Sequence, residues 1–183
     1  ITEEKNKKKS QYVLKDSMFK FWYTFIPKAA SVIEMGQGEL YYTKAVKPSL
    51  HFFMGTVFED MCRYYTLQHG ILGEFGCFLT SVGSWWGMET IVNDEGKKMG
   101  QSADIDVVAL SEIEKKAVVG ECKFKNEKLD RGVYETLLRR ANVLSSKYTI
   151  TKYMLFSLSG YTKWFDNMKD NRVMQISLDD MYQ

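Results

Sequence analysis

Three acidic side chains and one lysine stand inside two short apolar runs near the middle of the chain. The runs lie in residues 101–125, "QSADIDVVALSEIEKKAVVGECKFK", and their charged residues are Asp104, Asp106, Glu121 and Lys123. Hard divalent cations such as Mg²⁺ bind one or two carboxylates together with waters and phosphate oxygens. A neighbouring lysine would add positive charge at the same place. These residue types therefore predict metal-assisted chemistry on a phosphate.

The two runs flank a polar turn and predict a β-hairpin. Because side chains alternate along a strand, Asp104 and Asp106 share one face of the first strand. Glu121 and Lys123 likewise share one face of the second. If Leu110 pairs with Ala117, a six-residue turn is left between the strands. Asp106 then lies opposite Glu121, and Asp104 lies opposite Lys123.

Opposed side chains have Cβ atoms about 5 Å apart, and like charges at that distance are destabilising. We therefore expect a cation between Asp106 and Glu121. The alternative is a solvated hairpin face held by cross-strand ion pairs. Val108 and Val119 share the charged face, which indicates that it is at least partly packed.

The rest of the chain predicts an α/β fold with a mixed sheet. A helix opens at Pro48 and runs to about Gln68. The other predicted elements are a strand in 77–87, a turn in 93–100, the hairpin, a helix in 130–147, a strand in 151–160 and a short last strand in 172–183. We expect the main domain to span 47–183, preceded by an appendage over 1–46.

Four phrases occur in an order and at separations that resemble one protein family. They are "GTVFEDMC" (55–62), "GSWWG" (83–87), "DIDVVA" (104–109) and "GECKF" (120–124). Asp106 followed 15 residues later by Glu-x-Lys is similar to the core of the PD-(D/E)XK nuclease superfamily. With "YVLKDSMFKFWYTFI" (12–26) and "YMLFSLSGYT" (153–162), the phrases resemble the C-terminal domain of prokaryotic, archaeal-type predicted ATP-binding proteins. Members of that family carry an AAA-like ATPase and a winged-helix segment before this domain.

The resemblance implies a restriction-endonuclease-like αβββαβ core, a mixed central sheet flanked by helices, with a Mg²⁺ or Mn²⁺ site. Asp106 would be the central metal ligand, Glu121 the second ligand and Lys123 the catalytic lysine. Glu59 would match an additional metal-binding acid on the first helix, although it lies nearly opposite the main apolar stripe of that helix. Two departures are Asp104, where the family usually has Glu, and the absence of the nominal motif's Pro.

The function implied by the resemblance is that of a Mg²⁺-dependent endonuclease hydrolysing DNA phosphodiester bonds, with DNA and an upstream ATPase module of the same polypeptide as partners. Residues 1–46 would then be the tail of the winged-helix or ATPase region. The alternative is a catalytically inactive nuclease-fold module that binds nucleic acid or docks on the ATPase. A third interpretation is a partner-binding domain that dimerises through its aromatic N-terminal segment.

Composition narrows these classes. The net charge is +2, so a nucleic-acid site must be local. Three cysteines without CxxC spacing favour reduced thiols and a cytoplasmic protein. No apolar run has the length of a membrane span, and no Walker-type loop predicts ATP binding by this chain.

Several other residues admit two interpretations each. The pair Trp85 and Trp86 could stack on bases, but we expect at least one of them to pack in the core. Arg139 and Arg140 could contact phosphates, although a solvated helix face is the usual explanation for such residues. The chain begins at Ile1 and is therefore expected to be a fragment or a processed product.

Overall fold

The computed structural model describes residues 14–92 and 96–182, which fall into two compact units. The first unit ends at Phe58 and the second begins at Glu59. Helix α4 (Lys47–Gly70) contributes to both, and it confirms the helix predicted from Pro48. The expected boundary at residue 46 stays a prediction, and the charged lead-in over 1–10 and part of the turn in 93–100 lie outside the described residues.

The first unit is helical. It contains α1 (Ser17–Phe25), η2 (Pro27–Ala29), α2 (Ala30–Glu34), α3 (Gly38–Tyr41), the π-helical η3 (Tyr42–Val46) and the start of α4. Asp16 caps α1 by accepting a hydrogen bond from the Phe19 amide at 3.0 Å. Phe21, Phe25 and Phe53 pack with ring centroids 5.0 to 5.7 Å apart, which ties α1 to α4.

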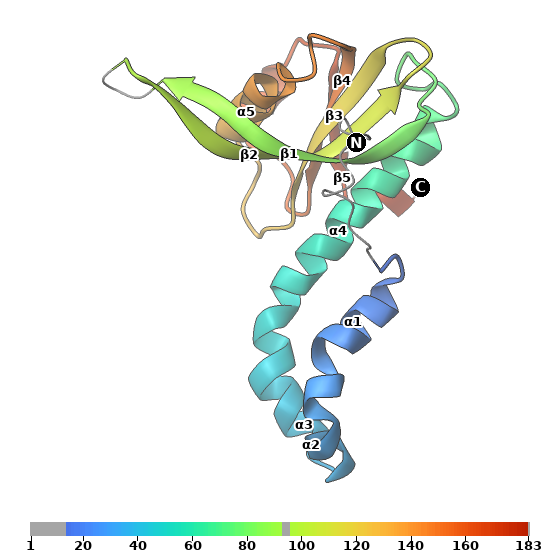
Figure 1. Ribbon diagram of the computed structural model, residues 1–183, viewed down its shortest axis with the longest axis vertical. Coiled ribbons are helices and arrows are strands. Elements are labelled where there is room, and N and C mark those ends of the chain that lie inside the picture. Colours follow the sequence, from blue (N-terminus) through green and yellow to red (C-terminus); the bar gives the residue numbers. More distant parts are fainter. Residues whose placement is uncertain (1–13, 93–95, 183) are drawn as a thin grey trace. The chain divides into compact units, whose positions relative to one another are not determined.

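The second unit is built on a mixed five-stranded sheet, which confirms the predicted α/β class (Figure 1). Its strands lie side by side in chain order: β1 (Ser81–Val92), β2 (Lys98–Ser111), β3 (Lys116–Lys123), β4 (Thr149–Ser157) and β5 (Val173–Ser177). The neighbouring pairs β1–β2 and β2–β3 are antiparallel, whereas β3, β4 and β5 are parallel. Parallel neighbours need a crossover, which α5 (Arg131–Ala141) supplies between β3 and β4. The remaining elements are the short helices η4 (Lys163–Asn167) and η5 (Asp179–Tyr182).

The main apolar core lies between the sheet and α5. It contains Val108, Leu110, Ala117, Val119, Leu137, Ala141 and Leu155, all at most 1% exposed. Trp85 packs against this core, while Trp86 on the next position is 54% exposed. The prediction that at least one of the two tryptophans packs in the core is therefore confirmed.

The opposite face of the sheet receives the last turns of α4. Thr66 donates to the sulfur of Met154 at 3.4 Å, and Tyr65 packs edge-on against Phe156. Met154 and Phe156 alternate along β4 with Leu155, which belongs to the core under α5. The sheet is thus covered by α5 on one face and by residues 59–70 of α4 on the other.

Strand β2 contains a β-bulge at the position of the predicted site. Gly83 of β1 pairs with Val108, but Trp85 pairs with Ile105, so β2 has one extra residue around Asp106. Ile105 consequently lies in the same core cluster as Val108. The uninterrupted alternation expected from residue 104 to residue 110 is therefore wrong, because the bulge resets which side chains share a face.

Candidate functional site

The β2–β3 ladder ends beside the predicted acids. We call the place where the two strands part, beyond the pair Val107–Gly120, the fork. Leu110 pairs with Ala117, as the sequence predicted, and the turn is shortened to residues 112–115 by one further pair. In the other direction the ladder ends at Val107 and Gly120. The expected direct oppositions of Asp106 with Glu121 and of Asp104 with Lys123 fall just beyond that last pair. The predicted register is confirmed, but these acids border a fork instead of a continuous ladder.

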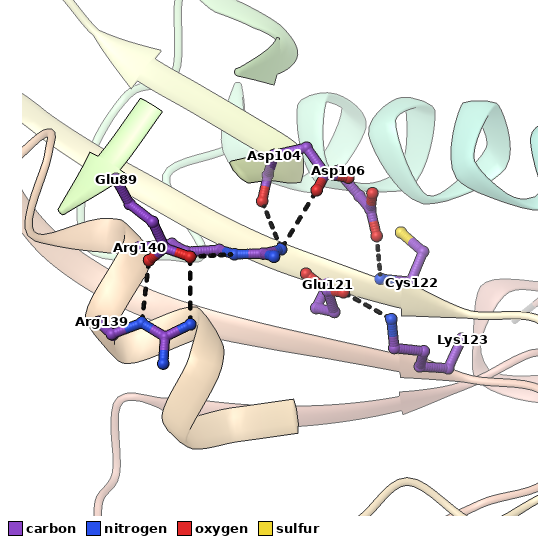
Figure 2. A network of polar contacts seen from close by, with 8 residues as sticks. All are labelled: Glu89, Asp104, Asp106, Glu121, Cys122, Lys123, Arg139 and Arg140. Atoms are coloured by element: carbon purple, nitrogen blue, oxygen red, sulfur yellow. Dashed lines mark hydrogen bonds and ion pairs between the residues drawn. The ribbon is translucent and has the colours of Figure 1, made fainter. Parts of the chain in front are cut away.

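The carboxylate of Asp106 accepts the first main-chain hydrogen bond inside the fork. Leu110 accepts from the Thr80 amide at 2.8 Å on the β1 side, so the odd-numbered residues next to it face β3. An uninterrupted ladder would then bring the Cys122 amide to the carbonyl of Ile105. Instead, the Cys122 amide donates to Asp106 Oδ2 at 2.8 Å (Figure 2). One carboxylate oxygen of Asp106 is thereby bound to the main chain, and a ligand would reach the other.

Glu121 carries an unsatisfied oxygen in the same place. Its Oε1 accepts from Lys123 Nζ at 2.6 Å, while its Oε2 is buried and, among the described residues, without a hydrogen-bond partner. Burial raises the pKa of Glu121, Asp106 repulsion raises it further, and Lys123 opposes both. Burial also raises the pKa of Asp106, against the lowering effect of the Cys122 amide and Lys123. Both carboxylates are therefore destabilised as anions and would gain from a nearby cation.

Lys123 remains a cation despite its partial burial. Burial favours the neutral amine, but Glu121 and Asp106 outweigh it, and the pKa of Lys123 is raised. The side chain is 29% exposed, so the ammonium has access to solvent as well as to the acids. Lys123 can thus donate hydrogen bonds to an anionic ligand between the strands.

Glu59 joins the site from α4. Its carboxylate Oε2 accepts from Arg63 Nη2 at 3.0 Å, and Arg63 Nη1 donates to the main-chain carbonyl of Asp106 at 3.2 Å. Burial and then repulsion from Asp106 raise the pKa of Glu59, while Arg63 lowers it. The structure therefore brings Glu59 to the acids of the hairpin, even though its side chain is 38% exposed. Arg63 itself was not foreseen, since nothing in its spacing distinguishes it from a surface arginine.

An ion-pair chain from β1 to α5 borders the other side of the fork (Figure 2). Arg139 binds both oxygens of the buried Glu89, at 2.9 and 3.2 Å, and this hydrogen bonding lowers the pKa of Glu89. Arg140 Nε lies 3.7 Å from Glu89, and Arg140 Nη1 donates to Asp104 at its main-chain carbonyl (2.8 Å) and at Oδ1 (3.3 Å). The expectation of a solvated arginine face is wrong for Arg140, which is only 16% exposed because it reaches β2.

A cavity of about 690 Å³ collects these groups. Glu59, Asp104, Asp106, Glu121 and Lys123 line it, together with Arg140 and the first turns of α5. Within residues 14–92 and 96–182, no set of three or more His, Cys, Asp and Glu side chains is arranged to hold a metal ion. Every site residue predicted from the sequence nevertheless borders this one polar cavity.

The second unit is thus a mixed α/β domain with an acidic, lysine-containing cavity. Comparison with known proteins gives the family of the chain. The chain belongs to the DUF234 family of archaeal and bacterial proteins of unknown function, whose model matches residues 22–140. It is 26% identical over 147 residues to a protein of Methanocaldococcus jannaschii described as uncharacterized. That alignment covers 79% of this chain and 30% of the relative, so the chain spans less than a third of that relative's length.

No solved structure matches the chain. The family match includes every residue of the candidate site from Glu59 to Arg140. In the described part of the chain, no helix combines the length and the apolar character needed to cross a membrane.

Proposed function

We propose that this chain is a divalent-metal-dependent nuclease domain that hydrolyses DNA phosphodiester bonds. The observation that carries the proposal is the buried, unpartnered Glu121 Oε2, which lies in the same cavity as the carboxylate of Asp106. A buried carboxylate oxygen without a donor is expensive unless a cation neutralises it. Burial raises the pKa of both carboxyl groups, and repulsion from Asp106 raises that of Glu121 further, which also favours a cation beside them.

The carboxylate oxygens of the cavity are donors of the kind that Mg²⁺ or Mn²⁺ binds, although the described acids are not already gathered into a set of three. These hard cations prefer carboxylate oxygens and fill the rest of their shell with water and phosphate oxygens. Asp106 would contribute Oδ1, since its Oδ2 is bonded to the Cys122 amide, and Glu121 would contribute Oε2. Glu59, restrained by Arg63, would be the additional acid. A bound metal ion of this kind would supply Lewis acidity and lower the pKa of a water ligand.

The protein side chains contribute positioning and charge. Lys123 is held beside the carboxylates by its 2.6 Å bond to Glu121, and its raised pKa keeps it protonated at neutral pH. A protonated amine at this position would bind a phosphate oxygen and stabilise the charge that develops on it during hydrolysis. Asp106 and Glu121 would hold the metal ion in the same cavity as Lys123.

The fold supports the same proposal. A helix before three antiparallel strands, then a crossover helix and a further strand, is the order expected of a restriction-endonuclease-like αβββαβ core. We further propose that this domain acts on DNA as part of a longer cytoplasmic polypeptide with an upstream ATPase module. The short share of the Methanocaldococcus relative that this chain spans leaves room for such a module in that protein.

One observation favours a second candidate, a catalytically inactive module that binds nucleic acid or docks on the ATPase. Lys123 already neutralises Glu121 at 2.6 Å, so the lysine itself could be the cation that the acids require. In that case the fork would hold an internal ion pair and would have no affinity for a metal.

Mn²⁺ titration calorimetry and a cleavage assay separate the two candidates. We expect the wild-type chain to bind Mn²⁺ and to cleave plasmid, flap or branched DNA with Mg²⁺ or Mn²⁺. Asp106→Asn should lose both properties, whereas the exposed Asp166→Asn, outside the cavity, should lose neither. Absence of Mn²⁺ binding by the wild type, or cleavage that survives in Asp106→Asn, would exclude the nuclease.

A further inference from the structure

Two arginines from opposite faces of the sheet bind the main chain of β2 at the fork. Arg63 of α4 donates through Nη1 to the carbonyl of Asp106 at 3.2 Å. Arg140 of α5 donates through Nη1 to the carbonyl of Asp104 at 2.8 Å. These are the two carbonyls on either side of Ile105, at the bulge where β2 gains its extra residue.

Both arginines are largely withdrawn from solvent and are also bound to an acid. The side chain of Arg63 is 19% exposed and that of Arg140 is 16% exposed. Arg63 binds Glu59 with its second nitrogen, and Arg140 reaches the carboxylate of Asp104 at 3.3 Å. A buried guanidinium needs such partners for its rigid set of five donors. Each side chain therefore has little freedom and fixes the carbonyl that it binds.

At the fork β2 is paired with β1 along one edge, while its ladder to β3 on the other edge has ended. Past Val107 and Gly120, β3 no longer pairs with β2, and main-chain groups near a protein interior require other partners. The bonds from Arg63 and Arg140 give the carbonyls of Asp106 and Asp104 such partners just past the end of the ladder.

We propose that Arg63 and Arg140 are positioning residues that hold β2 away from β3, so that Asp106 and Glu121 face a common ligand. This inference rests on the proposed function for its purpose, but the positioning itself is a property of the metal-free fold. Neither arginine has to touch the phosphate to act in this way. Each acts through the carbonyl and the acid that it binds.

The test compares Arg63→Gln and Arg140→Gln with their lysine counterparts in the full chain. Arg172→Gln is the matched control, because Arg172 pairs with Asp170, lies over the Tyr153 ring of β4 and is not among the residues that line the cavity. The first measurement is amide hydrogen exchange of Cys122, which reports its bond to Asp106 without any metal. The second is Mn²⁺ affinity, and the third is kcat and KM for DNA cleavage.

We expect the glutamine variants to speed exchange at Cys122 by about tenfold or more and to leave Leu155 in the middle of the sheet unchanged. Mn²⁺ affinity should fall by about 10–100-fold, as for residues that orient metal ligands, and kcat should fall with little change in KM. The lysine variants keep one donor and should recover part of each loss. Arg172→Gln should resemble the wild type throughout.

Unchanged exchange at Cys122 in both folded glutamine variants would overturn the positioning proposal, whatever the activity. If a glutamine variant fails to fold, the corresponding lysine variant decides by the same criterion. If the glutamine variants exchange faster at Cys122 but the wild type binds no Mn²⁺, the positioning proposal stands and the nuclease proposal fails. The two proposals can therefore fail separately.

Discussion

The main-chain amide of Cys122 donates a 2.8 Å hydrogen bond to Asp106 Oδ2, so the acid at the centre of the candidate site also supplies a hydrogen bond between β2 and β3. The bulge in β2 makes this possible, because it turns the Asp106 side chain toward the next amide of β3. The carboxylate of Asp106 thus has two roles. Its Oδ2 accepts a hydrogen bond from β3, and its Oδ1 is left for a ligand.

Substitutions of Asp106 should separate these two roles. Asparagine keeps an oxygen that can accept from Cys122, whereas alanine leaves this partly buried amide without its partner. We expect Asp106→Ala to lower the free energy of unfolding by about 1–3 kcal/mol relative to Asp106→Asn. Denaturant unfolding in EDTA measures the difference. Both variants should lose Mn²⁺ binding. Equal stability of the two in EDTA would refute the structural role of Oδ2.

Asp106 and Glu121 should each make the metal-free fold less stable as the pH rises. The pKa values of Asp106 and Glu121 are raised by burial, and repulsion from Asp106 adds to the effect at Glu121. Groups with a raised pKa bind protons more tightly when folded, so they stabilise the fold below their ordinary pKa values, 3.8 and 4.5. This contribution is lost as the pH rises through the raised values.

Thermal unfolding between about pH 4 and pH 8 tests this dependence. Excess Mn²⁺ should raise Tm at neutral pH and have little effect in acid, since protons and the cation compete for the same oxygens. Asp106→Asn provides the control, because it removes one titrating group and the repulsion on Glu121. Its Tm in EDTA should fall less steeply with pH than that of the wild type. Equal slopes would show that the two acids do not repel each other in the folded protein.

The sequence predicted the pairing of the hairpin and the residues of the site, but not the fork. Leu110 and Ala117 could be matched because two alternating apolar runs admit few registers that bury both. The bulge adds one residue near Asp106, and no glycine or proline marks it in β2. Arg63 and its Asp106 carbonyl are 43 residues apart, and such tertiary contacts leave no local pattern.

Glu89 had a signal that could have been used. Glu89 has the same parity along β1 as Trp85 and Ile91, so its side chain is expected on the same face as theirs. That face packs against α5. An acid on a packed face requires a partner, and the adjacent arginines of the predicted helix were the available cations. This pattern predicts a buried ion pair, although it does not say which arginine makes the bidentate contact.

Replacing Glu89 should therefore destabilise the second unit. Its side chain is 5% exposed and binds Arg139 through both oxygens, with Arg140 at 3.7 Å. Hydrogen bonding from Arg139 lowers the pKa of Glu89, and Glu89→Gln keeps the shape of the side chain but removes the negative charge that neutralises the arginines. We expect a loss of about 1–3 kcal/mol in the free energy of unfolding, measured with urea at neutral pH.

Glu135→Gln is the matched control for that measurement. Glu135 is 53% exposed and pairs along its own helix with Arg131 at 2.7 Å. Pairs of this kind contribute roughly 0.3–0.5 kcal/mol. If Glu89→Gln is no more destabilising than Glu135→Gln, the ion-pair chain between β1 and α5 does not stabilise the fold.

Removing Lys123 should be more harmful at neutral pH than in mild acid. Lys123→Met leaves Glu121 Oε1 without its donor beside an Oε2 that is already unpartnered, so a buried anion would lose its counter-charge. We expect a loss of about 2 kcal/mol at neutral pH, less than for a fully buried pair because the lysine is partly exposed. Protonation of Glu121 at lower pH should relieve most of it.

Urea unfolding at the two pH values, with Lys116→Met as the control in an exposed pair with Glu114, measures the difference. A pH-independent loss would mean that packing of the lysine stem, and not charge, holds Lys123 in the fork.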